Sequence, residues 1–108
     1  MRTVPFDSPA APGVRSVEKA ASLWARMKGL IGRSGLPPGS GMVIERCNAI
    51  HTFFMRFPID AVFFDKDWNP VKTVKNIRPW TFCVWGGMKA RRVLETDARR
   101  TRETFSSH

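Results

Sequence analysis

The spacing of apolar residues predicts one helix followed by a series of short strands. After Ser22, apolar residues recur every three or four positions as far as Ile31, with basic residues between them. This is the pattern of an amphipathic helix that has a serine N-cap and ends at Gly32. Beyond a turn-rich segment at 34–41, short apolar runs alternate with turn-forming residues. Strands are expected at residues 42–44, 49–57, 61–64, 71–74, 81–85 and 92–95.

Together these elements predict an α+β fold in a single compact domain. One short helix accompanies a mostly antiparallel sheet that is strongly bent or forms a small barrel. A parallel α/β fold is not expected, because only one helix is available to cross between parallel strands. The length of 108 residues suits one domain that buries a core without disulfides or a structural metal.

The chain divides into three segments. Three prolines and Gly13 make residues 1–13 a flexible leader or a strap over the surface. Residues 14–95 form the β-rich domain. Residues 96–108 form a basic C-terminal tail, for which disorder is an open alternative.

The formal net charge of +9 raises the question of nucleic-acid binding, since clustered Lys and Arg displace counterions from phosphate backbones. The charge is spread along the chain, however. Residues 89–108 carry six cations against three acids, and the other cations are scattered singly among strands and turns. A soluble basic surface is the simpler explanation, and nucleic-acid binding stays an alternative.

The two cysteines, Cys47 and Cys83, lie far apart in apolar contexts without a Cys-x-x-Cys spacing, so both are expected to be buried free thiols. We expect no metal or cofactor, because no phosphate-binding loop or zinc motif is present. The start of the chain lacks the apolar stretch of a secretory signal, and no run is apolar enough to span a membrane. A cytoplasmic location follows.

Potentially reactive side chains concentrate in the otherwise apolar run at 47–65. In an extended strand Cys47, His51 and Met55 share a face, and a thiol beside an imidazole can act as a nucleophile or bind a soft metal. Residues four apart on a strand are about 13 Å apart, however, so contact requires a bend. Asp60 begins an apolar strand, and its carboxylate needs donors such as Thr52, Arg56, Arg78 or backbone amides near Pro58.

Aromatic residues supply a second type of candidate site. Met55 with Phe53, Phe57, Trp80 and Trp85 would line a pocket for a flat or apolar ligand, although core packing explains them equally simply. The tripeptide at 78–80 places an arginine and a tryptophan on one loop, which suits an anion or a stacked base. The candidate ligand-binding residues are therefore His51, Thr52, Met55, Asp60, Arg78 and Trp80, with Cys47 as a possible reactive thiol.

Several motifs resemble one uncharacterised protein family. They are His-Thr-Phe-Phe-Met-Arg-Phe-Pro-Ile-Asp-Ala-Val-Phe-Phe-Asp at 51–65, Gly-Leu-Ile-Gly-Arg at 29–33, Leu-Pro-Pro-Gly-Ser-Gly-Met at 36–42, Asn-Ile-Arg-Pro-Trp at 76–80 and Ala-Arg-Arg-Val-Leu-Glu at 90–95. Over residues 14–95 the chain resembles the bacterial and archaeal proteins grouped as domain of unknown function 192. The resemblance implies a compact β-rich α+β fold and no established activity.

The chain departs from the pattern of that family at two places. Family members typically continue after the Leu-Glu position with a Leu-Pro-x-Gly segment and a closing strand, which are absent from Thr96 onward. An exposed sheet edge would then be covered by the leader or by a second copy of the chain, which makes a homo-oligomer an expectation. Trp68 stands where the family commonly has glycine, so the turn there is expected to avoid positive φ.

Three functions stay open. A small binding or accessory domain with a shallow aromatic pocket for a small ligand or a peptide requires His51 and Asp60 to converge on a cavity. An enzyme that uses His51 and Asp60 for acid–base or hydrolytic chemistry, with Cys47 as an optional nucleophile, requires those two side chains within hydrogen-bond reach of each other or of one water. An RNA-binding module that uses the basic surface requires Arg78, Arg91 and Arg92 to share one face with the aromatic residues.

Overall fold

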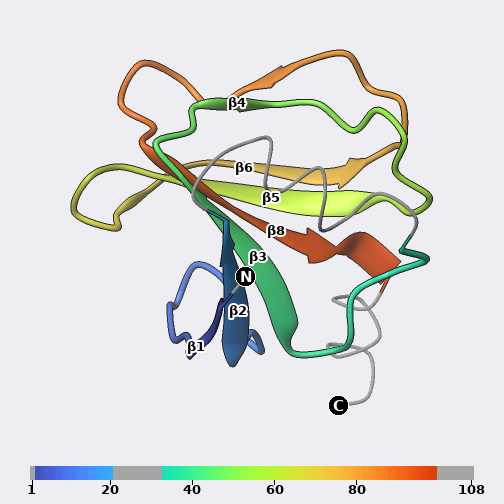
Figure 1. Cartoon of the computed structure of the whole chain (residues 1–108). Helices are drawn as coiled ribbons and strands as arrows, with labels where there is room; N and C mark the ends of the chain where they lie inside the picture. The colour runs from blue at the N-terminus through green and yellow to red at the C-terminus, as the bar shows by residue number, and fades with distance from the viewer. Residues whose placement is uncertain (1, 21–32, 100–108) are drawn as a thin grey trace.

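The computed structural model describes residues 2–20 and 33–99, which form two β-sheets (Figure 1). A six-stranded sheet has the order β1-β2-β3-β8-β5-β6, and β4 pairs with β7 in a two-stranded sheet. The strands are β1 (Arg2–Pro5), β2 (Ser16–Ala20), β3 (Ser40–Glu45), β4 (Ala49–Ile50), β5 (Ile59–Phe64), β6 (Pro70–Ile77), β7 (Val84–Trp85) and β8 (Arg92–Asp97).

The α+β prediction is wrong for the part of the chain that the structure describes, which is all-β apart from two helical residues at 98–99. The prediction depended on one helix at 22–31, and that segment lies outside the described residues. The small barrel is also wrong, because β1 and β6 are the two edges of an open sheet. The mostly antiparallel arrangement is confirmed, with the β2–β3 pair as the one parallel exception among the described strands.

The leader was predicted to lack regular structure, and this is wrong for Arg2–Pro5. These residues form β1, which pairs antiparallel with β2, so that Val4 lies opposite Val17. Pro5 ends an edge strand, where a missing N–H costs no ladder hydrogen bond. The leader therefore covers one edge of β2, a strand that the apolar pattern did not predict.

Four of the predicted strands are confirmed with small changes of boundary, namely β3, β5, β6 and β8. β8 extends to Asp97, two residues into the predicted tail, because it is a central strand paired with both β3 and β5. The strand predicted at 49–57 is mostly wrong, since only Ala49–Ile50 pairs. The strand predicted at 81–85 likewise shortens to β7. The loops that replace these strands carry the candidate site.

The apolar residues of the six-stranded sheet divide between its two faces. In β5, Ile59, Ala61 and Phe63 point into a first core, whereas Val62 and Phe64 point into a second. The first core lies on the side covered by β4 and β7, and the second lies under residues of the N-terminal segment. Because β5 is covered on both faces, all six of its residues are buried. Alternation along the strand therefore decides which side of the molecule each polar residue reaches.

The turn between β5 and β6 corrects a further expectation. The Oδ1 atom of Asp65 accepts hydrogen bonds from the backbone amides of Asp67 and Asn69, each at 2.9 Å. Trp68 has φ of 65°, although a turn without positive φ was expected. Its ring packs 5.2 Å from the Phe64 ring centroid and 4.2 Å from the Arg92 guanidinium carbon, contacts that offset the backbone strain.

Candidate functional site

Thr52 joins two loops that follow β4 and β6. Its backbone N–H donates to the Thr81 carbonyl at 3.1 Å, and its carbonyl accepts from the Trp80 amide at 2.9 Å. Its hydroxyl donates to the Arg78 carbonyl at 2.7 Å and accepts from the Thr81 amide at 2.8 Å. Thr52 is fully buried, and these bonds use its hydroxyl, its amide and its carbonyl. Thr52 therefore fixes the position of the two loops relative to each other.

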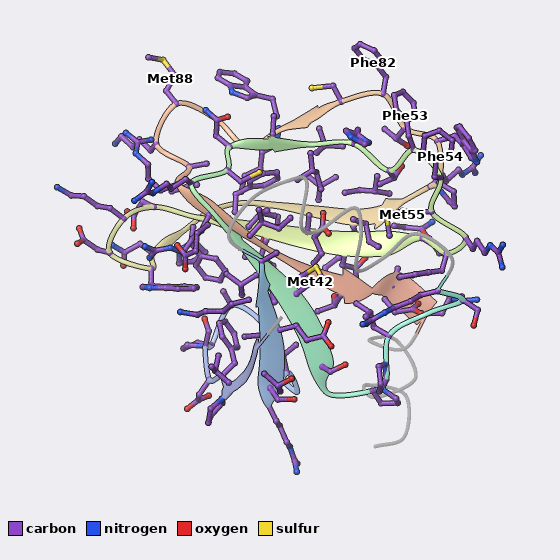
Figure 2. All side chains as sticks on the ribbon, in the orientation of Figure 1. Met42, Phe53, Phe54, Met55, Phe82 and Met88 are labelled. Atoms are coloured by element: carbon purple, nitrogen blue, oxygen red, sulfur yellow. The ribbon has the colours of Figure 1, made fainter. Side chains whose placement is uncertain are left out.

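The two joined loops place four aromatic side chains together, which we call the aromatic cluster: Phe53, Phe54, Trp80 and Phe82. Ring centroids are 4.9 Å apart for Phe54 and Trp80, and 6.0 Å apart for Phe53 with either Trp80 or Phe82. Figure 2 shows the three phenylalanines at the same end of the molecule. Phe54, Trp80 and Phe82 are 53%, 60% and 79% exposed. The cluster is thus an apolar surface and not part of the core.

Two residues of the aromatic cluster have a backbone conformation that bulky residues rarely adopt. Phe54 has φ of 65° and Trp80 has φ of 67°. For a non-glycine residue this left-handed region costs about 1–2 kcal/mol. Because both rings are more than half exposed, burial against the neighbouring rings offsets this cost only in part. The hydrogen bonds of Thr52 hold the loops in place and keep the rings directed outward.

His51 lies at the border of the aromatic cluster. Its ring centroid is 5.0 Å from that of Phe53, and its Nδ1 accepts a hydrogen bond from the Phe53 amide at 3.3 Å. Nδ1 therefore carries no proton in this arrangement. The ring is half-buried and oriented by its own loop.

Asp60 lies on the other face of the six-stranded sheet. Its neighbours Ile59 and Ala61 point into the first core, so its own side chain points away from it. Oδ1 accepts from the Asn76 amide at 2.8 Å, and Oδ2 lies 3.8 Å from the Lys75 ammonium. The register of β5 and β6 shifts at this point, and the hydrogen bond from Asn76 to Asp60 stabilises the irregular pairing. His51 and Asp60 do not converge, because the His51 loop covers the first core.

The remaining candidates have different surroundings. Met55 is buried in the first core, and the Arg78 side chain is exposed beside the aromatic cluster. Cys47 is buried, and its thiol donates to the Ala49 carbonyl at 3.1 Å, which requires the protonated sulfur. Cys83 is exposed, so the expectation that both thiols are buried is wrong for it. The structure thus brings together His51, Thr52, Arg78 and Trp80.

A family model matches residues 7–105 of the chain. The protein belongs to the DUF192 family, Uncharacterized ACR. No curated protein matches the chain.

Two crystal structures share the fold of this DUF192 protein. One, from Sinorhizobium meliloti 1021, is described as a "putative transcription regulator"; it has 22% identity and a TM-score of 0.71, and the match covers 83% of this chain and 74% of that one. The other is a protein of unknown function from Novosphingobium aromaticivorans DSM 12444, with 21% identity, a TM-score of 0.70 and coverage of 81% and 66%. At these identities the likeness concerns the fold alone.

Two buried acids of the DUF192 domain were not among the predicted site residues. Glu95 is fully buried, and its strand neighbours are Met42 in β3 and Ala61 in β5. Asp97, on the same face of β8, is also buried. The alternation of Val93, Glu95 and Asp97 would have placed all three side chains on one face. Because acids rarely point into a core, this alternation is a weak signal for two buried carboxylates.

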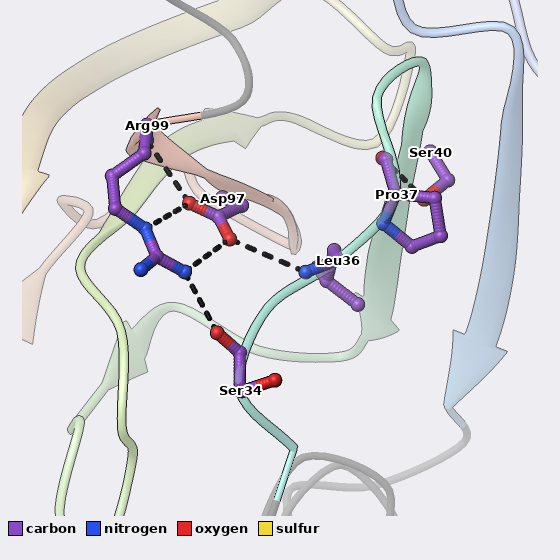
Figure 3. Close-up of polar contacts among 6 residues, drawn as sticks. All are labelled: Ser34, Leu36, Pro37, Ser40, Asp97 and Arg99. Carbon is purple, nitrogen blue, oxygen red and sulfur yellow. Dashed lines mark hydrogen bonds and ion pairs between the residues drawn. The ribbon is translucent and has the colours of Figure 1, made fainter.

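Asp97 anchors the segment before β3 through a clamp with Arg99 (Figure 3). The Arg99 guanidinium donates to Oδ1 at 3.1 Å and to Oδ2 at 2.9 Å, and also to the Ser34 carbonyl at 2.7 Å. The amides of Arg99 and Leu36 add bonds at 3.0 and 3.3 Å. Burial alone would raise the pKa of Asp97, but these hydrogen bonds outweigh it and lower the pKa. The clamp has a structural role.

Neither metal binding nor a membrane span gains support from the described residues. Across residues 2–20 and 33–99, no group of three or more His, Cys, Asp or Glu side chains could hold a metal ion. Over the same ranges no helix has the length and hydropathy needed to cross a membrane.

Proposed function

We propose that this DUF192 domain is a non-enzymatic binding domain that docks a peptide segment of a partner protein on the aromatic cluster. The segment carries acidic and apolar side chains. The observation behind this proposal is that exposed aromatic rings stand on two loops in strained backbone conformations. These rings pack mainly on one another and stay more than half exposed, and strained backbone at such a surface is a feature of functional sites in proteins.

The exposure of the cluster supports contact with a protein. Contiguous exposed apolar surface on a domain is a frequent mark of an interaction site. Tryptophan and other aromatic residues also dominate binding energy at protein interfaces, because a rigid ring buries much area at little entropic cost. Phe54, Trp80 and Phe82 project from the surface with more than half of their area exposed, which suits a peptide better than a small enclosed ligand.

The flanking charges favour an acidic segment. Arg56 follows Phe54 by two residues and Arg78 precedes Trp80 by two, and both side chains are exposed. Among the described residues neither arginine takes part in an ion pair. Carboxylates of a bound peptide would supply that partner, and opposite charges also speed the encounter.

An RNA-binding role is less well supported by the geometry. Ile59 at one end of β5 lies opposite Ile77 and Asp97, whereas Phe64 at the other end lies opposite Arg92. Arg78 and Arg92 are therefore separated by the length of β5, about 20 Å for six residues. Arg92 is also engaged with Glu45 at 3.0 Å and with the Trp68 ring. Arg78 lies beside the aromatic cluster and Arg92 at the other end of β5, so the two arginines do not form one basic face with the cluster.

An enzymatic role gains less support from the contacts of its candidate residues. The acid–base pair predicted from the sequence is divided between the two faces of the sheet. Cys47 is a buried thiol whose hydrogen points to a backbone carbonyl. These contacts favour a binding role over nucleophilic catalysis.

The test is a selection of short random peptides displayed on phage against the full chain, followed by titration of the enriched peptides in solution. We expect enriched sequences to combine acidic and apolar residues. Trp80→Ala and Phe54→Ala should weaken binding by about 30-fold, the effect of a residue worth about 2 kcal/mol. Trp85→Ala is the matched control, because Trp85 is 53% exposed but lies outside the cluster.

Oligothymidylate and vesicles containing phosphatidylserine serve as competing probes. Binding of either probe with the same dependence on Trp80, in the absence of peptide binding, would overturn the proposal. An equal loss of peptide affinity in Trp85→Ala would also refute it, because the cluster would then have no special role.

A further inference from the structure

A basic pocket lies at the end of the six-stranded sheet opposite the aromatic cluster. It has a volume of about 910 Å³, and its lining includes Arg46, Asn48, Lys66, Arg91, Arg92 and one acid, Glu45. The residues come from the segment after β3, the β5–β6 turn and the start of β8. This volume is in the range of small-molecule sites.

Backbone hydrogen bonds hold the three segments together. The Cys47 amide donates to the Arg91 carbonyl at 2.9 Å, and the Arg91 amide donates to the Phe64 carbonyl at 2.8 Å. The Gly86 amide donates to the Asn48 carbonyl at 2.7 Å. The backbone beneath the cations is thus fixed before any ligand arrives, which lowers the cost of binding.

The local charge is positive even after ion pairs are counted. Glu45 is neutralised by Arg92, with Nε at 3.0 Å, and it also has Lys19 at 3.8 Å. Arg46 and Lys66 form no ion pair within the described residues. The guanidinium of Arg91 uses Nη1 on the Met88 and Ala90 carbonyls and keeps its other donors.

Acids in the adjoining hollow reduce this charge without cancelling it. That hollow is lined by Asp65 and Asp67 with Lys66, Lys89 and Arg91. Hydrogen bonds from the backbone amides of Asn69 and Asp67 lower the pKa of Asp65, so this carboxylate stays ionised. Its oxygens accept bonds within the turn. Around the two hollows, cations still outnumber acids.

Arg46 provides an independent observation at the pocket. It has φ of 53° and an exposed side chain. Glycine or asparagine adopts this conformation at lower cost, and no burial of the Arg46 side chain offsets the strain. The strained residue therefore presents a long cationic side chain at the rim of a cationic hollow.

We propose that this pocket binds a small phosphorylated anion carrying two or more negative charges. Arginine donates paired hydrogen bonds that match phosphate oxygens, and lysine adds a point charge. The cations converge on one hollow instead of following a track, which favours a small molecule over a nucleic-acid strand. This site is separate from the aromatic cluster and does not depend on the function proposed for it.

The experiment titrates the full chain with pyrophosphate at low ionic strength, by calorimetry and by amide shifts in NMR spectra. We expect saturable binding at one site with a dissociation constant of about 1 mM or tighter, and shifts at residues 46–48, 66 and 90–92. Arg46→Gly should weaken binding at least about tenfold. Because glycine suits the backbone at this position, the fold should be retained. Lys66→Ala should act in the same direction.

Arg15→Ala is the control, since it removes the same charge from an exposed side chain beside the start of β3, whereas Arg46 follows the end of that strand. An equal loss of affinity in Arg15→Ala would overturn the proposal, because only net charge would then matter. Citrate serves as a carboxylate probe, and binding of citrate as tight as that of pyrophosphate would refute a phosphate site. Amide shifts confined to residues outside the pocket would refute it as well.

Discussion

Two tryptophans with the same backbone strain allow a direct test of whether the aromatic cluster serves the fold or a partner. Trp68 has φ of 65° and Trp80 has φ of 67°. Replacing either by glycine relieves about the same strain and adds about the same flexibility to the unfolded chain, so these two effects cancel in a comparison. What differs is the surroundings of the two rings.

The difference can be worked from the contacts. Trp68 is 37% exposed and Trp80 is 60% exposed. For a side chain of about 250 Å², Trp68 buries about 60 Å² more, which is worth about 1.5 kcal/mol. Each ring has two described aromatic neighbours, but Trp68 also contacts the Arg92 guanidinium, for about 0.5–1 kcal/mol. We expect Trp68→Gly to reduce the free energy of unfolding by about 2 kcal/mol more than Trp80→Gly.

The assay is urea unfolding followed by far-ultraviolet circular dichroism, since each substitution changes the fluorescence. A difference of about 2 kcal/mol corresponds to about 8–16 °C in melting temperature for a domain of this size. The binding assay should give the reverse order, with peptide affinity lost in Trp80→Gly and kept in Trp68→Gly. Equal costs of unfolding, or a larger cost for Trp80→Gly, would refute the reasoning, because the cluster would then be a structural element.

Three further substitutions test individual contacts. Asp97→Asn should reduce the free energy of unfolding by about 2 kcal/mol near neutral pH. Because the pKa of Asp97 is lowered in the folded protein, the ionised carboxylate stabilises the fold above the ordinary carboxyl pKa, and this stabilisation is lost as the pH falls, so urea midpoints should show a smaller cost near about pH 3. A cost that does not depend on pH would contradict the Arg99 clamp. Gly86→Ala should lower thermal stability by about 2 kcal/mol, since an added Cβ would overlap the Phe63 ring. Thr52→Val should cost about 1–2 kcal/mol in urea unfolding and also weaken peptide binding, because the partly buried Arg78 carbonyl and Thr81 amide lose their partner. Unchanged peptide binding would contradict the positioning role of Thr52.

Most of the six-stranded sheet could be predicted from the pattern of apolar residues. β3, β5 and β8 are central strands whose apolar runs reflect burial on both faces. The strand β6 could be predicted from the turn-forming residues at 65–69 that precede it. β1 was missed because a short edge strand that ends in proline depends on its neighbour more than on its own sequence. β2 was missed because only two of its five residues, Val17 and Ala20, are apolar and buried.

The candidate site was only partly predictable for a related reason. The run at 51–57 is as apolar as a buried strand, but Phe54 adopts a left-handed conformation that breaks it. Nothing in the residue types separates an exposed Phe54 or Phe82 from a buried Phe57, since exposure depends on contacts between distant loops. Asp60 was correctly expected to need a donor, but the donor is the Asn76 amide, which an irregularity between two strands places there.

The distribution of left-handed residues connects the two proposed sites. Among the described residues five non-glycine residues have positive φ, and two have local compensation: the Trp68 ring packs on its neighbours, and the Asn76 amide is bound by Asp60. Of the other three, Arg46 has an exposed cationic side chain, and the rings of Phe54 and Trp80 pack on each other at 4.9 Å while staying more than half exposed. Arg46 lies at the basic pocket, and the two aromatic residues lie in the aromatic cluster, at opposite ends of the sheet. Since the doubly covered central strands supply the stability that tolerates this strain, both ends can keep residues that would be replaced if folding were their only role.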